Sequence, residues 1–342
     1  MMLAGDPIIQ VTDLVKEYRG GLRAVDGVSF SVQRGEIFGF LGPNGAGKTT
    51  TIMVLISLLR PTAGRAVVCG HDVAREPDRV RSRIGYVSQD IAVDDALTGE
   101  QNLFLQGRLY HLDRETIARR MAEVLAMVDL TDRAGDLVLT YSGGMRKRLD
   151  IAEGLIHRPD ILFLDEPTLG LDIQTRRRIW DYIRLLRARE GVTVFMTTHY
   201  MEEADQLCDR VAIIDHGRIV ALGSPAELKA AIGGDLLTLD IAAGDGHAAG
   251  DLVGLLRTVP GTKQAFRADD GRWVLVAGHG EEAAPAVLEV LGAHGLRVRS
   301  LAMKKPTLDD VFLHYTGREL RRSEGSDDFG RMRMGLRRAR MG

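Results

Sequence analysis

The sequence predicts an α/β fold in which a parallel sheet carries helices on both faces, followed by a smaller α+β unit. Short apolar runs that are typical of buried strands occur at 161–166 (ILFLDE), 192–198 (VTVFMTT) and 210–215 (RVAIID). They alternate with segments of helical periodicity at roughly 100–127 and 174–190. Because alternating strands and helices form doubly wound parallel sheets, we expect that architecture here.

Two N-terminal segments predict the first strands. Residues 8–18 (IIQVTDLVKEY) and 28–42 (VSFSVQRGEIFGFLG) are alternating or continuous apolar runs. A Gly-Gly turn at 20–21 and an Arg-Gly turn at 34–35 bound them. We therefore expect the first sheet to begin in this part of the chain.

The pattern changes after the Gly-Gly pair at 233–234. A strand (LLTLDIA), a helix at about 247–258, a hairpin signalled by Asp-Gly within 262–278, a helix at about 280–294 and a strand (RVRSLAM) follow. A unit of about 80 residues folds only marginally alone, so we expect it to lean on the rest of the chain or on a second copy. The expected divisions are a first domain at 1–232, a small α+β domain at 233–317 and a flexible Arg-rich tail at 318–342.

Composition excludes several classes of protein. The chain has 45 Lys and Arg residues against 47 Asp and Glu residues, which lacks the basic excess of proteins that coat nucleic acid, so we expect no nucleic-acid partner. Its two cysteines, Cys69 and Cys208, stand in no metal-ligand spacing and fit a reducing compartment. We find no signal-peptide pattern and no apolar run of the ~18 residues that a membrane span needs. We therefore expect a cytoplasmic chain that does not cross a bilayer.

Residues 42–49 (GPNGAGKT) fit the phosphate-binding pattern G-x-x-x-x-G-K-[ST]. They follow the apolar strand EIFGFL and precede the apolar helix TTTIMVLISLL, and this context disfavours a chance glycine-rich turn. The glycines let backbone N–H groups surround phosphates at a helix N-terminus. We expect Lys48 to reach the β- and γ-phosphates and Thr49 to bind magnesium. The expected nucleotide-binding residues of this loop are Gly42, Pro43, Asn44, Gly45, Ala46, Gly47, Lys48, Thr49 and Thr50.

A second motif is the apolar strand 161–164, which ends in Asp165 and Glu166. Alone, such a run is commonly a strand that leaves the core. Behind a phosphate-binding loop, however, the strand directs both carboxylates at the phosphates. We expect Asp165 to hold magnesium through its water shell and Glu166 to polarise the attacking water.

Between these motifs lies Tyr141-Ser142-Gly143-Gly144-Met145, directly before an arginine-rich helix start. It resembles the signature of the ABC ATPases, usually Leu-Ser-Gly-Gly-Gln. A helix N-cap would equally explain Ser142. The resemblance implies that Ser142, Gly143 and Gly144 contact the nucleotide held by a second copy. Met145 departs from the usual glutamine and cannot make its hydrogen bonds, which bears on nucleotide specificity.

Further landmarks of the ABC family follow in order. Gln89 in YVSQD resembles the Q-loop glutamine, Leu171-Asp172 the D-loop, and His199 the switch histidine, while Tyr18 resembles the aromatic residue that stacks on adenine. Each is weak alone, because a Gln at a strand end is commonly solvated and a single His or Tyr is commonly structural. The resemblance implies the catalytic residues Glu166, His199 and Lys48, the metal-binding residues Thr49, Gln89 and Asp165, and Asp172 as a nucleotide contact.

Two longer stretches, EPTLGLD at 166–172 and KKPTLDDVFLHYTGREL at 304–320, resemble the daunorubicin-resistance type of exporter ATPase. This resemblance implies an ATP hydrolase that uses ATP and Mg²⁺ and dimerises head to tail around two ATP molecules. The dimer would be a homodimer, with a heterodimer of two ATPase subunits as the alternative. It also implies a separate membrane-spanning subunit, driven from the cytoplasmic face of the cell membrane to export drugs or other amphipathic molecules. A nutrient-importer ATPase is the alternative that residues 8–230 leave open. DNA-repair and translation ABC proteins fit less well, because we find one phosphate-binding loop and no sustained heptads.

Two surface segments have roles that stay open at this point. We expect 89–104 to contribute to the surface for the membrane subunit, although ordinary helical surface would be equally exposed. The Arg-rich tail at 318–342 would fit anionic lipid headgroups, or it would simply be solvated.

Overall fold

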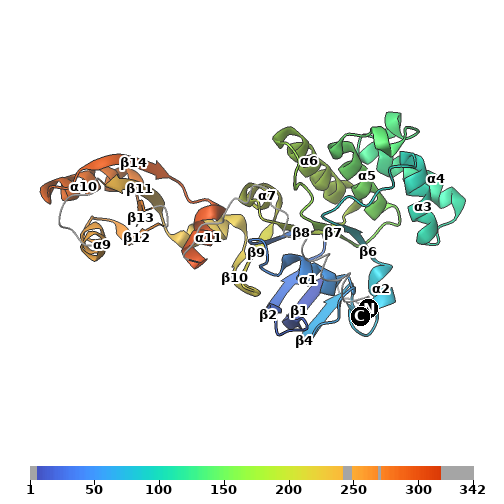
Figure 1. The fold of residues 1–342 in the computed structure, drawn as a ribbon, viewed down its shortest axis with the longest axis horizontal. Helices are drawn as coiled ribbons and strands as arrows, with labels where there is room; N and C mark the ends of the chain where they lie inside the picture. The colour runs from blue at the N-terminus through green and yellow to red at the C-terminus, as the bar shows by residue number, and fades with distance from the viewer. Residues whose placement is uncertain (1–5, 242–248, 269–270, 317–342) are drawn as a thin grey trace.

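The computed structural model describes residues 6–241, 249–268 and 271–316 of the chain. Figure 1 shows a larger part, which carries β1 to β10, and a smaller part with β11 to β14 beside it along the long axis. The segment that we expected to be a flexible Arg-rich tail, 318–342, lies outside the described residues.

A six-stranded sheet forms the centre of the larger part. Its strand order is β10-β9-β3-β8-β7-β6, and the pairs from β9 to β6 are parallel, which confirms the predicted parallel sheet. The edge strand β10 is antiparallel to β9. Because parallel strands end at one edge, the segments after β3, β7 and β8 lie side by side. The strands are β3 (Ile37–Leu41), β6 (Ile84–Val87), β7 (Ile161–Asp165), β8 (Thr193–Thr198), β9 (Arg210–Asp215) and β10 (Arg218–Gly223).

The two N-terminal runs form strands as expected, and they supply β1, β2 and β3. β1 pairs with both β2 and β4 in a second, antiparallel sheet, and β5 lies at its edge. Phenylalanine rings from β2, β3, β7 and β8 pack together between the sheets, with the Phe30 and Phe38 ring centroids 5.4 Å apart. This apolar layer fixes the start of the loop that follows β3. The strands of the second sheet are β1 (Ile9–Glu17), β2 (Arg23–Val32), β4 (Ala63–Val68) and β5 (His71–Asp72).

Helices cover both faces of the six-stranded sheet. Figure 1 shows α1 on the side of β1, β2 and β4, whereas α3 to α6 form a layer on the opposite side. Residues of this helical layer share one apolar core with β7 and β8. The helices are α1 (Lys48–Leu55), α2 (Pro77–Arg81), α3 (Gly99–Leu109), α4 (Arg114–Met127), α5 (Gly143–Leu155), α6 (Ile173–Glu190), α7 (Met201–Leu207) and α8 (Pro225–Ile232).

The helical periodicity at 100–127 corresponds to two helices rather than one. α3 ends at Leu109 and α4 begins at Arg114. His111 between them has a φ of 59°, and the Asp113 carboxylate caps α4 by accepting a hydrogen bond from the Thr116 amide at 2.8 Å. The break therefore comes from a capping aspartate, which interrupts a periodic pattern without a proline or glycine.

The smaller part is a four-stranded antiparallel sheet in the order β12-β13-β11-β14. Two helices pack on one face of it around Leu237, Leu239 and Leu275. The hairpin expected within 262–278 is the pair β12 and β13. The elements are β11 (Asp235–Ile241), α9 (Ala249–Arg257), β12 (Thr262–Arg267), β13 (Trp273–Ala277), α10 (Gly280–Ala293) and β14 (Val298–Lys304).

The last described helix, α11 (Leu308–Thr316), returns to the larger part. Its buried residues Leu308, Val311 and Phe312 join the same apolar core as Leu228 and Ile232 of α8. The small unit therefore does lean on the rest of its own chain, as its size predicts.

None of the helices in the described parts of the chain is long and apolar enough to span a membrane.

Candidate functional site

The loop 42–47 connects β3 to α1 and depends on glycine at two kinds of position. Gly47 has a φ of 107° and Gly45 a φ of 82°, which L side chains rarely adopt. A Cβ at Gly47 would lie 2.3 Å from the carbonyl oxygen of Ala24, and one at Gly42 would lie 2.2 Å from that of Ile214. The loop therefore presses against neighbouring backbone, and it leaves the unpaired N–H groups of α1 available for an anion.

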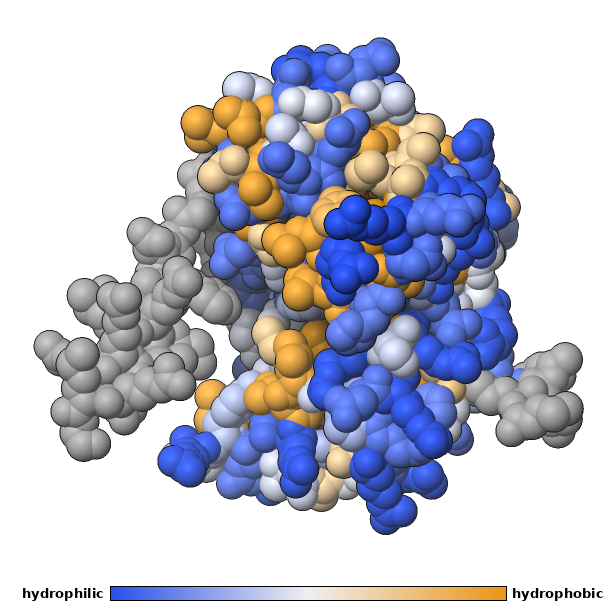
Figure 2. Space-filling view, turned by 90° about the vertical axis from the view of Figure 1, so that its right-hand side faces the viewer, coloured by the Kyte–Doolittle hydropathy of each residue, from blue (hydrophilic) through white to orange (hydrophobic). Residues whose placement is uncertain are grey.

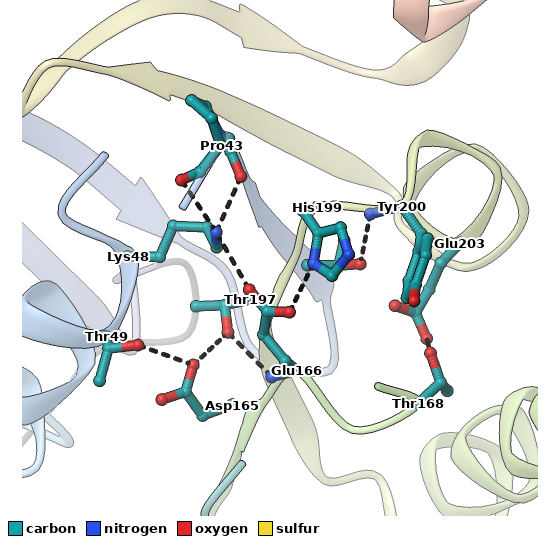
Figure 3. Close-up of polar contacts among 12 residues, drawn as sticks. Pro43, Lys48, Thr49, Asp165, Glu166, Thr168, Thr197, His199, Tyr200 and Glu203 are labelled. Atoms are coloured by element: carbon teal, nitrogen blue, oxygen red, sulfur yellow. Dashed lines mark hydrogen bonds and ion pairs between the residues drawn. The ribbon is translucent and has the colours of Figure 1, made fainter. Parts of the chain in front are cut away.

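Lys48 lies at the start of α1 and is 5% exposed. Its Nζ donates hydrogen bonds to the carbonyl oxygens of Gly42 (2.8 Å) and Pro43 (3.2 Å), as Figure 3 shows. The same atom forms an ion pair with Oε1 of Glu166 at 3.0 Å. The loop lysine and the carboxylate after β7 are thus in direct contact.

Glu166 follows β7 in a left-handed conformation, with a φ of 48°. Its amide donates to Thr197 Oγ1 at 3.0 Å, and its Oε2 accepts a hydrogen bond from His199 Nδ1 at 2.5 Å. Burial alone would raise the pKa of this carboxyl, but the His199 hydrogen bond and the charge of Lys48 outweigh burial and hold the pKa below its ordinary value. Glu166 is therefore a carboxylate at neutral pH, with one oxygen on Lys48 and the other on His199.

Asp165 ends β7 beside Glu166 and is also buried. Its Oδ1 accepts hydrogen bonds from Thr49 Oγ1 at 3.3 Å and from Thr197 Oγ1 at 2.5 Å. Burial raises the pKa of this carboxyl, and the two hydroxyl groups oppose that rise. Mg²⁺ favours a few hard oxygen ligands supplemented by water and phosphate, so the Thr49 hydroxyl and the Asp165 carboxylate fit that ion.

Two other expected nucleotide contacts lie near this cluster. The Tyr18 hydroxyl and Thr50 Oγ1 are 3.3 Å apart, which places the tyrosine beside the first turn of α1. Gln89 is exposed in the loop after β6, at the same edge of the sheet as Asp165. No hydrogen bond among the described residues joins Gln89 to Thr49 or Asp165, so the structure brings together two of the three expected metal-binding residues.

The signature residues form a separate group on the helical layer. Ser142 caps α5 by accepting from the Met145 amide at 3.3 Å, so the N-cap role that it could have from sequence is present. Asp172 caps α6 and accepts from the Thr175 amide at 2.9 Å. A Cβ at Gly144 would lie 2.5 Å from Thr175 Cγ2, so the signature packs against the start of α6. In the described residues this group makes no hydrogen bond to Lys48 or Glu166.

Sequence reasoning missed Thr197. It stands in the apolar strand 192–198, where its hydroxyl bridges the Asp165 carboxylate and the Glu166 amide. Its only signal in the sequence was a hydroxyl residue near the end of a largely apolar strand, and the structure buries it completely. That signal is common in strands, and only the neighbouring strand shows what the hydroxyl contacts.

These features define the class of protein. A phosphate-binding loop leads into α1, a buried strand ends in adjacent carboxylates, and the serine-capped start of α5 packs against the start of α6. Together these are the parts of an ATP-binding cassette.

Comparisons with known proteins agree with that class. The ABC transporter family model matches residues 25–169, and the model of the C-terminal domain of DrrA1-3-like ATP-binding proteins matches residues 223–316. A daunorubicin resistance ATP-binding protein of Streptomyces coeruleorubidus is 46% identical over 94% of this chain and 99% of its own length. The daunorubicin/doxorubicin resistance ATP-binding protein of Streptomyces peucetius is 44% identical over 90% of this chain and 92% of its own.

Two solved structures share the fold of the larger part. The cbiO1 subunit from Clostridium perfringens superposes with a TM-score of 0.62 at 28% identity, covering 66% of this chain and 91% of that one. A dimeric post-hydrolysis state of the cassette MJ0796, bound to ADP and Pi, gives a TM-score of 0.57 at 26% identity, covering 63% of this chain and 98% of that one. The chain therefore belongs to the ABC transporter family, as an ATP hydrolase that resembles the daunorubicin-resistance proteins.

Proposed function

We propose that the chain is the energy-supplying subunit of an exporter, in which two copies close head to tail around two ATP molecules. The observation that carries this proposal is the division of the site into two groups. The Lys48 and Glu166 cluster lies on the sheet, whereas Ser142 and Gly144 lie on the helical layer beside α6. One ATP is then covered by the first group of one copy and the second group of the other.

The residues of the first group suit phosphoryl transfer. Glu166 orients the attacking water, Lys48 and His199 stabilise the charge on the γ-phosphate, and a bound Mg²⁺ would neutralise the charge that develops on the phosphate oxygens. We propose Thr49, Asp165 and Gln89 as the magnesium-binding residues. Gln89 lies in the loop after β6, so magnesium binding by this residue would link the metal site to the segment that follows it.

We also propose that Tyr18 stacks on adenine. Its ring is held beside α1 by the contact with Thr50, and Lys16 Nζ lies 5.6 Å from the ring centroid. The glycine loop takes the phosphates at the other end of the nucleotide.

The surface for the membrane subunit is proposed at the segment after Gln89 and on α3. Large apolar side chains stand exposed there, at 40% for Ile91 and Phe104, 49% for Leu105 and 65% for Leu109. Figure 2 looks at this side of the molecule and shows hydrophobic residues gathered between hydrophilic ones. Such a surface fits a membrane protein that meets the cassette at the cytoplasmic face of the membrane.

Export of drugs or other amphipathic molecules is proposed from the named relatives and from residues 223–316, since the cassette alone would also fit a nutrient importer. The test is co-reconstitution in lipid vesicles with a candidate membrane-spanning subunit supplied as a separate chain. We expect ATP-dependent expulsion of daunorubicin that stops when ATP is replaced by ADP. ATP hydrolysis coupled to uptake of a solute, with daunorubicin unmoved, would favour the importer.

Met145→Gln restores the usual signature residue at the proposed interface. Because signature contacts act across the closed dimer, we expect a modest change in ATPase rate and unchanged ATP affinity of the isolated chain. Met145 also packs partly against the core that contains Leu149, so a loss of about 1 kcal/mol in unfolding free energy should accompany the change. Met145→Leu, which keeps the packing, is the control. Loss of ATP binding in Met145→Gln would show that this residue serves the core alone.

The small C-terminal unit is proposed as an accessory dimer contact that keeps the two copies near each other after hydrolysis. A chain truncated at residue 232 should bind ATP but dimerise at least about tenfold more weakly and transport more slowly with the membrane subunit. Because truncation also uncovers Ile232 and Leu228, which α11 buries, the full-length variant Leu288→Glu is the sharper test. Leu288 on α10 is 48% exposed, so the charge leaves the fold intact. Full-rate export by both variants would contradict this role.

Any contact of the segment 318–342 with lipid headgroups is a separate hypothesis.

A further inference from the structure

The Glu203 carboxyl on α7 is completely buried, yet it takes no part in the cluster around Lys48. Its Oε1 accepts two hydrogen bonds, from Thr168 Oγ1 at 3.0 Å and from Trp180 Nε1 at 3.0 Å. Figure 3 shows the Glu203 and Thr168 side chains facing each other beside the His199 and Tyr200 segment. Since Trp180 belongs to α6, one oxygen atom joins the loop after β7, α6 and α7.

The partners of Glu203 belong to segments that carry expected site residues. Thr168 lies between Glu166 and Asp172, in a turn closed by the hydrogen bonds from Leu169 N to Glu166 O (3.1 Å) and from Leu171 N to Thr168 O (3.2 Å). Glu203 is in the first turn of α7, which begins two residues after His199. The carboxyl therefore ties the turn that leads to the D-loop directly to the helix that follows the switch histidine.

A second contact joins the same two segments. The guanidinium of Arg176, on the first turns of α6, lies 3.9 Å from the centroid of the Tyr200 ring. The Tyr200 ring in turn packs against the His199 ring, with the centroids 4.1 Å apart. The helix α6, whose start Asp172 caps, is thus linked to the segment around His199 by two contacts, one through Glu203 and one through Tyr200.

We propose that Glu203 is a positioning residue that couples the D-loop to the switch histidine, so that the two segments move together when the dimer closes. This inference rests on the proposed roles of His199 and Asp172. When the dimer closes, the signature loop of the second copy displaces the D-loop. Through Glu203 this displacement also changes the position of His199 relative to Glu166. The rate of hydrolysis in one site then depends on closure of the dimer, although Glu203 does not contact the nucleotide.

The hydrogen-bonding chemistry identifies an informative pair of variants. Burial raises the pKa of the Glu203 carboxyl. A glutamine keeps one oxygen that can accept from Thr168 and Trp180, whereas alanine leaves both donors buried without an acceptor. Glu203→Gln should therefore preserve the coupling, and Glu203→Ala should remove it.

The experiment uses the full-length chain and measures single-turnover ATP hydrolysis, ATP affinity and tryptophan emission. With Trp273→Phe as background, the emission comes from Trp180, because the chain has 2 Trp residues. We expect Glu203→Ala to hydrolyse at least about tenfold more slowly with ATP affinity changed less than about threefold, and Glu203→Gln to stay near the parent. The emission change caused by ATP and Mg²⁺ should persist in Glu203→Gln and vanish in Glu203→Ala.

Glu36→Ala is the matched control, because Glu36 is also buried and accepts hydrogen bonds from the Gln33 amide (2.7 Å) and Arg210 (3.3 Å) at the opposite end of β3. Equal slowing of Glu36→Ala and Glu203→Ala, or parent-like hydrolysis by Glu203→Ala, would overturn the proposal. If Glu203→Ala does not fold, Thr168→Val removes one donor at constant shape and should slow hydrolysis in the same direction, and an unchanged rate there would also overturn it. Failure of the proposed ATPase mechanism itself is distinguishable, since it would appear in Glu166→Gln whatever Glu203 does.

Discussion

Glu166→Gln should bind ATP, hydrolyse it about 10²- to 10⁴-fold more slowly than the parent chain, and accumulate as a dimer. Glutamine has nearly the same size, but it cannot accept the proton or hold the water as a carboxylate does. The amide also removes the negative partner of Lys48, whose Nζ lies 3.0 Å from Oε1 of Glu166. Because a carboxylate no longer competes with phosphate for this lysine, ATP affinity should be retained or improved.

Size-exclusion chromatography and hydrolysis of radiolabelled ATP would measure both effects. The dimer should appear with ATP and Mg²⁺ and disappear when ADP replaces ATP. Parent-rate hydrolysis by Glu166→Gln would remove this residue from the proposed role. A monomer that holds ATP without hydrolysing it would instead contradict the head-to-tail arrangement.

Lys48→Ala should fail one step earlier, at nucleotide binding. A charge-assisted hydrogen bond contributes about 1.5–3 kcal/mol, so losing the phosphate contact should weaken ATP binding about 10- to 100-fold. The substitution also leaves Glu166 without its lysine partner in a buried site, which should lower thermal stability as well.

Equilibrium binding of a fluorescent ATP analogue, together with thermal unfolding, separates these two losses. Lys229→Ala is a useful control, because Lys229 pairs with Asp205 at 2.7 Å in another part of the chain. ATP affinity of Lys48→Ala within about twofold of the parent would show that the backbone N–H groups of the loop hold the phosphates without this lysine.

The sequence was most informative where a function depends on neighbouring residues. The glycine loop needs left-handed backbone at Gly45 and Gly47 between a strand and a helix. The strand, the glycines and the helix are all recognisable within one short stretch of sequence. The two carboxylates likewise follow directly from the apolar strand that carries them. The Asp-Gly pair in the sequence predicted the hairpin of the small unit, and the alternation of strands and helices predicted the parallel sheet. The helix pair at 99–127 was less readable, because the capping aspartate Asp113 is a weak signal within a periodic run.

The tertiary structure alone decided which of these groups meet. In the sequence Lys48, Glu166 and His199 follow strands that are far apart, and nothing local states that β8 lies between β3 and β7. That strand order puts Thr197 against Asp165, and both His199 and Lys48 against Glu166. It also buries Glu203 between Thr168 and Trp180. The physical reason is that backbone conformation is set largely by residues close in sequence, whereas the packing of parallel strands joins segments through long crossovers whose order depends on the whole apolar core.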